Sequence, residues 1–195
     1  RQMCIRDREG VQHETTAGNP QRPDAPSTAY MWEEIFTRDS ILGLIYDFAY
    51  TAPNHKTNKT KDATPIFPRY QQLRAVRRVA DDMQKNGTLR DYLIEHSAGS
   101  GKTNTIGWLA HKLAGLYGEG EDDLMFSKVL IVTDRIVVDK QLQTAVQDMN
   151  KSGDIVRVID SAGRADESGE STKSGKLKKA LKGGYRIIVC TMGSF

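Results

Sequence analysis

Cysteine is scarce in this chain of 195 residues, and long apolar runs are missing altogether. The two cysteines, Cys4 and Cys190, lie far apart in unrelated contexts, so they indicate neither a disulfide framework nor a metal site and favour a reducing compartment, the cytoplasm. No stretch approaches the roughly 18 consecutive apolar residues that a membrane-spanning helix needs. His13, His55 and His111 show no spacing typical of metal ligands.

A strong charge of either sign is also missing. The chain has 28 basic and 25 acidic residues, and the resulting net charge of +3 allows a nucleic-acid partner without requiring one. The length of 195 residues suits one domain or slightly more, and a hydrophobic share of 38% can form a core from part of the chain. The first residues, Arg1-Gln2-Met3, are neither an initiator methionine nor a signal peptide, which suggests a piece of something longer.

The first third of the chain does not look like an independent domain. Residues 1–29 are polar, contain several prolines and lack apolar periodicity, which predicts an extended linker. Residues 30–66 form a predicted helical connector, because apolar residues recur at helical spacing from Trp32 to Phe48, with a break near Thr37–Ser40. Within it, Ala52 to Pro65 is polar and is expected to be a solvated surface loop.

Residues 67–195 alternate between strand-like and helix-like segments. This order predicts an α/β fold with a mostly parallel sheet flanked by helices. The expected helices are 69–85, 103–117, 135–149 and a short basic one at 175–181. The expected strands are 92–95, 128–133, 155–159 and 186–191. The strand at 128–133 is apolar enough to be buried on both faces.

The octapeptide from His96 to Thr103 lies between an expected strand and an expected helix. A glycine-rich turn followed by Gly-Lys-Thr at that junction is typical of a phosphate-binding P-loop, although His96 replaces the usual first glycine. Lys102 would place its charge on the β- and γ-phosphates, and the Thr103 hydroxyl would ligate Mg²⁺. The residues expected to surround the nucleotide here are Ser97, Ala98, Gly99, Ser100, Gly101, Lys102, Thr103 and Asn104.

An aromatic residue and a glutamine precede this loop by about thirty residues. In the segment Phe67 to Gln72, the Tyr70 ring could stack on adenine and the Gln72 carboxamide could pair with the amino edge of the base. The alternative is an ordinary helix N-terminus opened by Pro68. The neighbouring P-loop favours the adenine interpretation.

Two strand ends carry residues suited to phosphate contacts. Thr133 and Arg135 follow one expected strand, and Thr191 ends another. Ligands of parallel α/β sheets meet the carboxyl ends of strands, so these residues are candidates for contacting a nucleic-acid backbone. Each threonine could instead cap the following helix. The basic run from Lys173 to Arg186 is interpreted as a solvated helix face, with DNA contact as the alternative.

The chain resembles the motor region of type I restriction endonuclease R subunits over about two thirds of its length. The His-Ser-Ala-Gly-Ser-Gly-Lys string is specific, because it accounts for His96. The stretch from Trp32 to Phe48 also looks like that family's connector between nuclease and motor. The other segments that carry the resemblance are Phe67–Val76, Tyr92–Glu95, Ile106–His111, Val129–Arg135 with Asp139 and Gln141-Leu142, and Ile187–Thr191 with Phe195.

The resemblance implies a superfamily 2 translocase with a RecA-like fold, which hydrolyses ATP with Mg²⁺ to pull duplex DNA before a separate nuclease domain cuts. Specificity and methyltransferase subunits would be its partners. It implies that Gln72 reads adenine, that Lys102 and Thr103 act at the phosphates, and that the DNA backbone is gripped at the motifs containing Thr133, Arg135 and Thr191. The sequence stops before the family's acidic Walker B segment, so little turnover is expected of this piece alone.

Two other interpretations stay open at this point, and a different P-loop class, a GTPase or a small-molecule kinase, is disfavoured. The chain could be another superfamily 2 motor, such as a repair or remodelling helicase, or a non-catalytic piece that binds ATP or DNA. A GTPase would need an Asn-Lys-x-Asp guanine reader after the P-loop, whereas Asn58-Lys59-Thr60-Lys61 precedes it and lacks the aspartate. A small-molecule kinase would leave Tyr70 and Gln72 unexplained.

Overall fold

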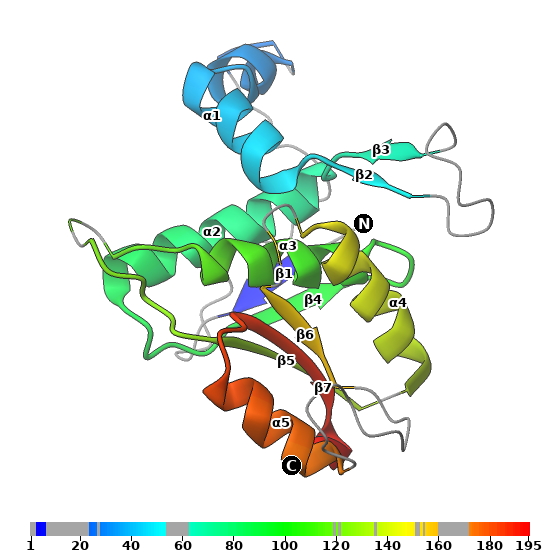
Figure 1. The fold of residues 1–195 in the computed structure, drawn as a ribbon. Helices are drawn as coiled ribbons and strands as arrows, with labels where there is room; N and C mark the ends of the chain where they lie inside the picture. The colour runs from blue at the N-terminus through cyan, green and yellow to red at the C-terminus, as the bar shows by residue number, and fades with distance from the viewer. Residues whose placement is uncertain are drawn as a thin grey trace. The chain divides into compact units, whose positions relative to one another are not determined.

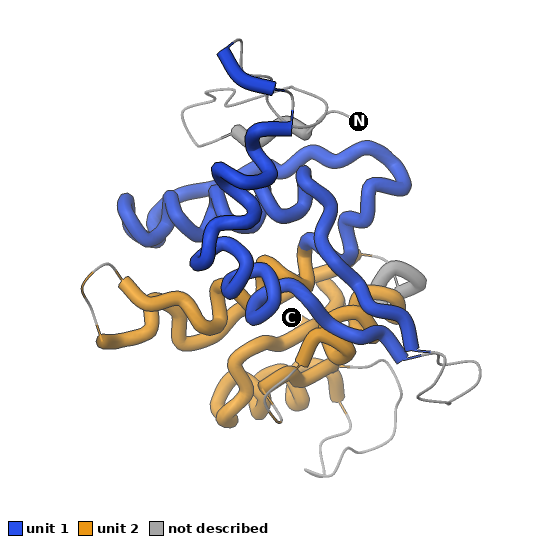
Figure 2. Tube along the Cα trace, turned by 90° about the horizontal axis from the view of Figure 1, so that it is seen from above, with its two compact units in different colours: residues 1–105 blue, residues 106–195 orange. Residues whose placement is uncertain are grey.

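The chain folds into two compact units, residues 1–105 and 106–195 (Figures 1 and 2). This computed structural model describes residues 3–6, 24–26, 28–53, 63–118, 120, 122–134, 136–150, 153, 155–159 and 172–195. None of the helices in these ranges is long and apolar enough to cross a membrane.

The first unit contains a broken helical segment. It consists of η1 (Met31–Ile35), α1 (Arg38–Gly43) and η2 (Leu44–Phe48). Thr37 between η1 and α1 has extended backbone, which confirms the predicted break. The ends of the polar stretch predicted as a loop are paired instead, because β2 (Tyr50–Ala52) and β3 (Thr64–Ile66) form an antiparallel pair. The intervening residues 54–62 lie outside the described ranges.

Helix α2 (Tyr70–Asn86) and strand β4 (Leu93–His96) lead to the P-loop, close to their predicted bounds. The buried residues of α2 recur at helical spacing, and Ala75 packs against Ile94 of β4. Gly87 ends the helix with a φ of 82°, in the left-handed region that glycine adopts without strain. Strand β1 (Met3–Arg6) pairs antiparallel with β4, within a segment predicted to be extended linker.

The second unit contains a three-stranded parallel sheet in the order β5-β7-β6. This confirms the predicted α/β fold with a parallel sheet flanked by helices, which is consistent with part of a RecA-like motor. Its strands are β5 (Val129–Thr133), β6 (Val156–Val158) and β7 (Ile187–Thr191). Its helices are α3 (Lys102–Ala114), which begins in the first unit, α4 (Ile136–Asp148), α5 (Lys173–Lys182) and the short η4 (Met192–Ser194).

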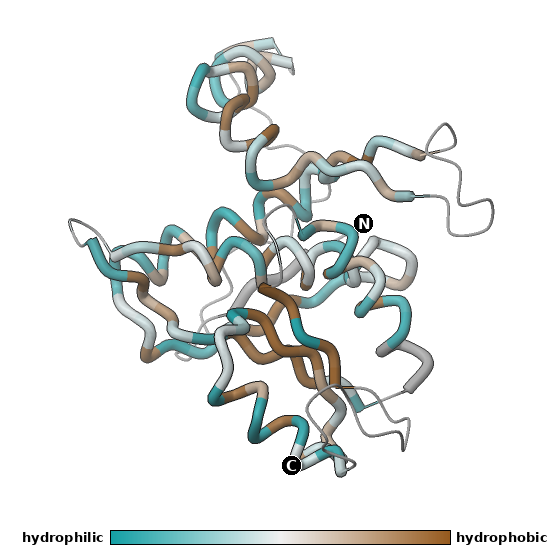
Figure 3. Tube along the Cα trace, viewed as in Figure 1, coloured by the Kyte–Doolittle hydropathy of each residue, from teal (hydrophilic) through white to brown (hydrophobic). Residues whose placement is uncertain are grey.

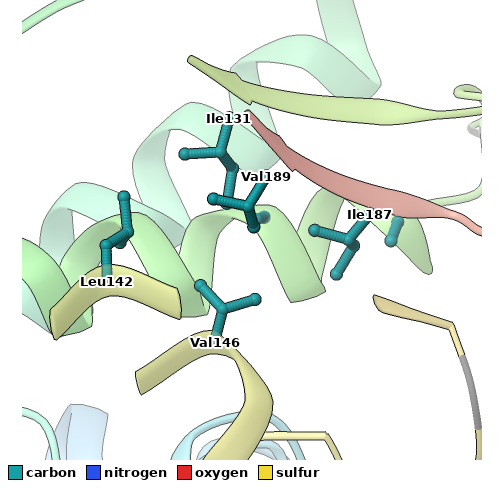
Figure 4. Close-up of a cluster of buried hydrophobic side chains, with 7 residues drawn as sticks. Ile131, Leu142, Val146, Ile187 and Val189 are labelled. Carbon is teal, nitrogen blue, oxygen red and sulfur yellow. The ribbon is translucent and has the colours of Figure 1, made fainter. Parts of the chain in front are cut away.

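Both faces of β7 are buried, and successive residues face opposite helical layers. Ile187 and Val189 pack with Leu142 and Val146 of α4 and with α3 (Figure 4). Ile188 and Cys190 belong to a second cluster, with α5. The connection through α4 runs from β5 past β7 to β6, and the connection through α5 runs back from β6 to β7. Right-handed crossovers that run in opposite directions place their helices on opposite faces.

Strand β5 does not match its prediction of burial on both faces. Figure 3 shows the apolar character of β5 and β7, but in β5 Leu130 is 38% and Val132 45% exposed, while Ile131 is buried. The reason is positional, because β5 is an edge strand of the described sheet and α5 packs over β7 rather than over β5. The apolar run therefore predicts the strand correctly, but its prediction that both faces of the strand are buried is wrong.

Candidate functional site

The start of α2 is tied to the P-loop by one side chain. The Gln72 Oε1 atom accepts a hydrogen bond from the Arg69 backbone N–H at 2.8 Å, which caps the helix. The Gln72 Nε2 atom donates to the Gly101 carbonyl at 2.9 Å and to the Ser100 carbonyl at 3.4 Å. Because this side chain is buried, these bonds fix the loop against α2.

Tyr70 and Gln72, the predicted adenine readers, therefore have protein partners in this structure. The Tyr70 hydroxyl accepts from Arg74 Nη1 at 2.5 Å, and the Arg74 guanidinium carbon lies 5.6 Å from the Tyr70 ring centroid. Adenine reading stays a prediction for both residues. To be read by these side chains, an adenine base would have to replace or share the hydrogen bonds that Tyr70 and Gln72 make within the protein.

The P-loop turns through two glycines with left-handed backbone. Gly99 has a φ of 68° and Gly101 a φ of 86°. A Cβ atom at position 101 would also lie 2.4 Å from Gln72 Nε2, well inside van der Waals contact. Gly101 is thus required twice, for its backbone conformation and for the space that Gln72 occupies.

The N-terminus of α3 presents backbone donors. Thr105 N–H bonds the Gly101 carbonyl at 3.2 Å, so the helix ladder begins there. Among the described residues, no acceptor pairs with the N–H groups of Lys102, Thr103 and Asn104. Such free donors, together with the helix dipole, favour an anion at this end.

The Lys102 ammonium is folded back onto the loop. Its Nζ atom donates to the His96 carbonyl at 2.8 Å and to the Ser97 carbonyl at 3.0 Å, while the side chain remains exposed. The glycine-rich turn, the free N–H groups, the exposed cation and the Thr103 hydroxyl at the second helical position together fit a nucleotide phosphate chain with Mg²⁺. The structure thus brings together the predicted loop residues in a geometry that suits that ligand.

His96 stands at the first position of the loop. Both of its ring nitrogens are buried without a hydrogen-bond partner in the part of the chain that the structure describes, and so is the Ser100 hydroxyl. Burial, and secondly the Lys102 ammonium, hold the pKa of His96 below its ordinary value of 6.5. Its surroundings therefore favour the neutral imidazole at the first position of the candidate phosphate loop.

A second polar anchor, which sequence reasoning missed, lies at the other end of β4. The Asp82 carboxylate accepts from the Tyr92 hydroxyl at 2.5 Å and from Asn86 Nδ2 at 2.9 Å, and it lies 3.7 Å from Arg90. Only the spacing of Asp82 and Asn86, four residues apart on one helix, gives a local signal. Helix α2 consequently holds the strand at its beginning and the P-loop after its end.

The structure brings the two predicted threonines together. Thr133 and Thr191 are directly paired across β5 and β7, at the carboxyl edge of the sheet. Thr191 is buried, and its Oγ1 atom lies 3.3 Å from Ser194 Oγ. Arg135 lies outside the described residues. Contact with DNA stays a prediction for all three. No group of histidine, cysteine, aspartate and glutamate that could hold a metal occurs among the described residues.

Comparison with known proteins gives one match. Residues 71–195 match the family described as the SWI2/SNF2 ATPase. The matched region begins within α2 and includes the P-loop and the whole second unit. No protein of curated function and no solved structure matches the chain.

Proposed function

Because the chain belongs to the SWI2/SNF2 ATPase family, we propose that it is the ATP-driven DNA motor of a type I restriction enzyme R subunit. The observation that carries the motor assignment is the P-loop itself: two left-handed glycines, free N–H groups at the start of α3, and the Lys102 ammonium beside them. The family match gives the reaction class, ATP hydrolysis: with Mg²⁺ bound, the terminal phosphoryl group of ATP would be transferred to water and ADP would leave.

Each loop residue has a defined part in holding that ligand. The N–H groups of Lys102, Thr103 and Asn104 would donate to phosphate oxygens, and the Thr103 hydroxyl would ligate Mg²⁺. Lys102 would exchange the His96 and Ser97 carbonyls for phosphate oxygens. This exchange is favourable because a charge-assisted bond to an anion is stronger than one to a neutral carbonyl.

The restriction assignment rests on the octapeptide with histidine at its first position. The string His96-Ser97-Ala98-Gly99-Ser100-Gly101-Lys102 and the strand from Val129 to Thr133 support it. In this proposal the partners are duplex DNA and the specificity and methyltransferase subunits, and cleavage belongs to a separate nuclease domain. The second candidate is a SWI2/SNF2-type DNA motor outside any restriction system, which the family match favours equally.

The decisive experiment is ATP hydrolysis by the intact protein with and without duplex DNA. We expect DNA to stimulate hydrolysis and Lys102→Ala to abolish it. Lys140→Ala, at an exposed position of α4, is the matched control and should retain full activity. Hydrolysis indifferent to DNA would overturn the motor proposal. Copurification with a methyltransferase and a specificity subunit separates the two candidates, because only the restriction assignment predicts it.

A further inference from the structure

Helix α5 has two chemically different faces. Its buried residues, Lys176, Leu177 and Ala180, lie toward the sheet, where Leu177 and Ala180 pack with Ile188 of β7. Hydropathy alternates along α5 (Figure 3), and its exposed residues are mostly polar, with Leu181 as the apolar exception. Ser174, Lys178 and Lys182 recur every fourth residue and are all exposed, so they form one stripe along the helix.

This stripe borders a groove of about 350 Å³ at the carboxyl end of β7. The α5 side of the groove includes Leu177 and Leu181 together with the Ser174–Lys178–Lys182 stripe, and the other side is made by Ser194 and Phe195, which follow the strand. Phe195 is 72% exposed. Ser194 and Phe195 follow closely on Thr191, which ends β7 and is paired with Thr133 of β5.

Positive charge is concentrated in this part of the chain. Residues 171–195 contain five lysines and one arginine but no aspartate or glutamate. These six charges exceed the net charge of +3 of the whole chain, so the remaining residues are negative on balance. The region is therefore a local positive field and not part of an evenly basic surface.

The two lysines of the stripe have no structural task in the described part of the chain. The ammonium groups of Lys178 and Lys182 form no hydrogen bond or ion pair with any residue that the structure describes. Lys128, by contrast, donates to the carbonyls of Gly183 and Tyr185 and so serves the fold. Like charges four residues apart on a helix repel one another, so the pair does not stabilise α5.

We infer that the Ser174–Lys178–Lys182 stripe, at the rim of this groove, binds the phosphate backbone of duplex DNA. Phosphate oxygens suit the stripe because its two ammonium groups and its hydroxyl can all donate to an anion, and residues 171–195 contain no carboxylate side chain that would compete. Four residues of helix advance about 6 Å, which spans roughly two phosphates of one strand at about 3.4 Å of axis each. The inference rests on the proposed DNA motor and adds a phosphate site that neither strand-end threonine supplies.

The test is the salt dependence of DNA binding by the intact protein. A short fluorescein-labelled duplex is titrated with wild type and with Lys178→Gln/Lys182→Gln over a series of salt concentrations. We expect the double variant to bind more weakly and to reduce the slope of log affinity against log salt by about two, because each neutralised phosphate contributes about 0.9 to that slope. Its melting temperature should be unchanged or raised, since a repulsive pair is removed.

Two further variants make the result specific. Lys178→Arg/Lys182→Arg should restore both affinity and slope, because the charges return. Lys85→Gln/Lys140→Gln removes two exposed lysines from α2 and α4 and should leave the slope unchanged. If wild type binds DNA but the stripe variant keeps its slope, this inference fails and the motor proposal stands.

Two other outcomes also overturn the inference. If wild type does not bind duplex DNA and DNA does not stimulate ATP hydrolysis, the proposed function fails along with it. If the stripe variant loses binding to a polyglutamate peptide as strongly as binding to the duplex, the groove is a site for acidic polypeptide.

Discussion

In the parallel sheet, β7 contacts its surroundings almost wholly through apolar side chains, with Ile187, Ile188, Val189 and Cys190 all at 0% exposure. The P-loop is held instead by polar atoms, the Gln72 amide on the Gly101 carbonyl and the Lys102 ammonium on the His96 carbonyl. Apolar burial is non-directional and tolerates small shifts, whereas hydrogen bonds fix positions. Substitutions in the sheet should therefore change stability, and substitutions at the loop should change ligand binding.

The largest expected effect comes from truncating the sheet. Ile188→Ala removes a fully buried side chain from the cluster under α5 and should cost about 2 to 5 kcal/mol of unfolding free energy. Leu130→Ala, on the partly exposed face of neighbouring β5, should cost only about 1 kcal/mol. Urea denaturation followed by the fluorescence of buried Trp108 measures both.

The same variant tests whether the two regions are energetically separate. Folded Ile188→Ala should bind ATP with wild-type affinity, because no loop atom depends on that side chain. Equal destabilisation by Ile188→Ala and Leu130→Ala would show that burial in the sheet is not what the structure indicates. A weakened ATP affinity in the folded variant would contradict the contrast between the regions.

An intermediate effect is expected at the loop, where two glycines form a matched pair. Gly101 and Gly87 both have positive φ, 86° and 82°, so alanine at either should cost about 1 to 3 kcal/mol in strain. Only at Gly101 would the new Cβ meet another group, Gln72 Nε2 at 2.4 Å. Gly101→Ala should therefore also weaken ATP binding about tenfold or more, equivalent to about 1.4 kcal/mol, whereas Gly87→Ala should not.

Removing Gln72 makes this test sharper. In Gly101→Ala/Gln72→Ala the clash disappears while the backbone strain remains. The losses of ATP affinity and of stability in the double variant should therefore be smaller than the sums of the losses in the two single variants. Titration with a fluorescent ATP analogue and thermal melting give the two readings. Strict additivity in both would mean that Gln72 does not hold the loop as its hydrogen bonds indicate.

The two regions also differ in how far the sequence alone could describe them. Helix α2 and strands β5 and β7 follow from periodicity and apolar runs, and the P-loop from the spacing of Gly99, Gly101 and Lys102. These are local signals. The β1–β4 pairing, the uncovered face of β5 and the Asp82–Tyr92 bond depend on partners elsewhere in the chain, which no local pattern encodes.

Gln72 shows the same limit within one residue. Its position before the P-loop is informative, and an adenine contact is the natural interpretation of a carboxamide there. The structure gives its amide two carbonyl acceptors, at Ser100 and Gly101, twenty-eight and twenty-nine residues away. A sequence identifies a polar group that must be satisfied when buried, but not which acceptor satisfies it.

The smallest expected effect concerns pH and belongs to the polar region. Because burial and then Lys102 lower the pKa of His96, the folded protein disfavours its protonation, and the unfolded chain binds more protons in acid. The stabilising contribution of the neutral ring is complete above the ordinary pKa of 6.5 and is lost as pH falls through the lower, folded value. Wild type should therefore lose melting temperature as pH falls from above 6.5 through the lower, folded pKa of His96.

His96→Phe, which keeps an aromatic ring and cannot titrate, should show a shallower decline over the same range. Lys102→Ala should retain most of the dependence, because burial is the larger cause and remains when the ammonium is removed. If His96→Phe melts with the wild-type pH dependence, the titrating group lies elsewhere. If Lys102→Ala abolishes the dependence, the Lys102 charge rather than burial lowers the pKa of His96. Packing around the buried ring nitrogens would then matter less to the loop than the charge beside them.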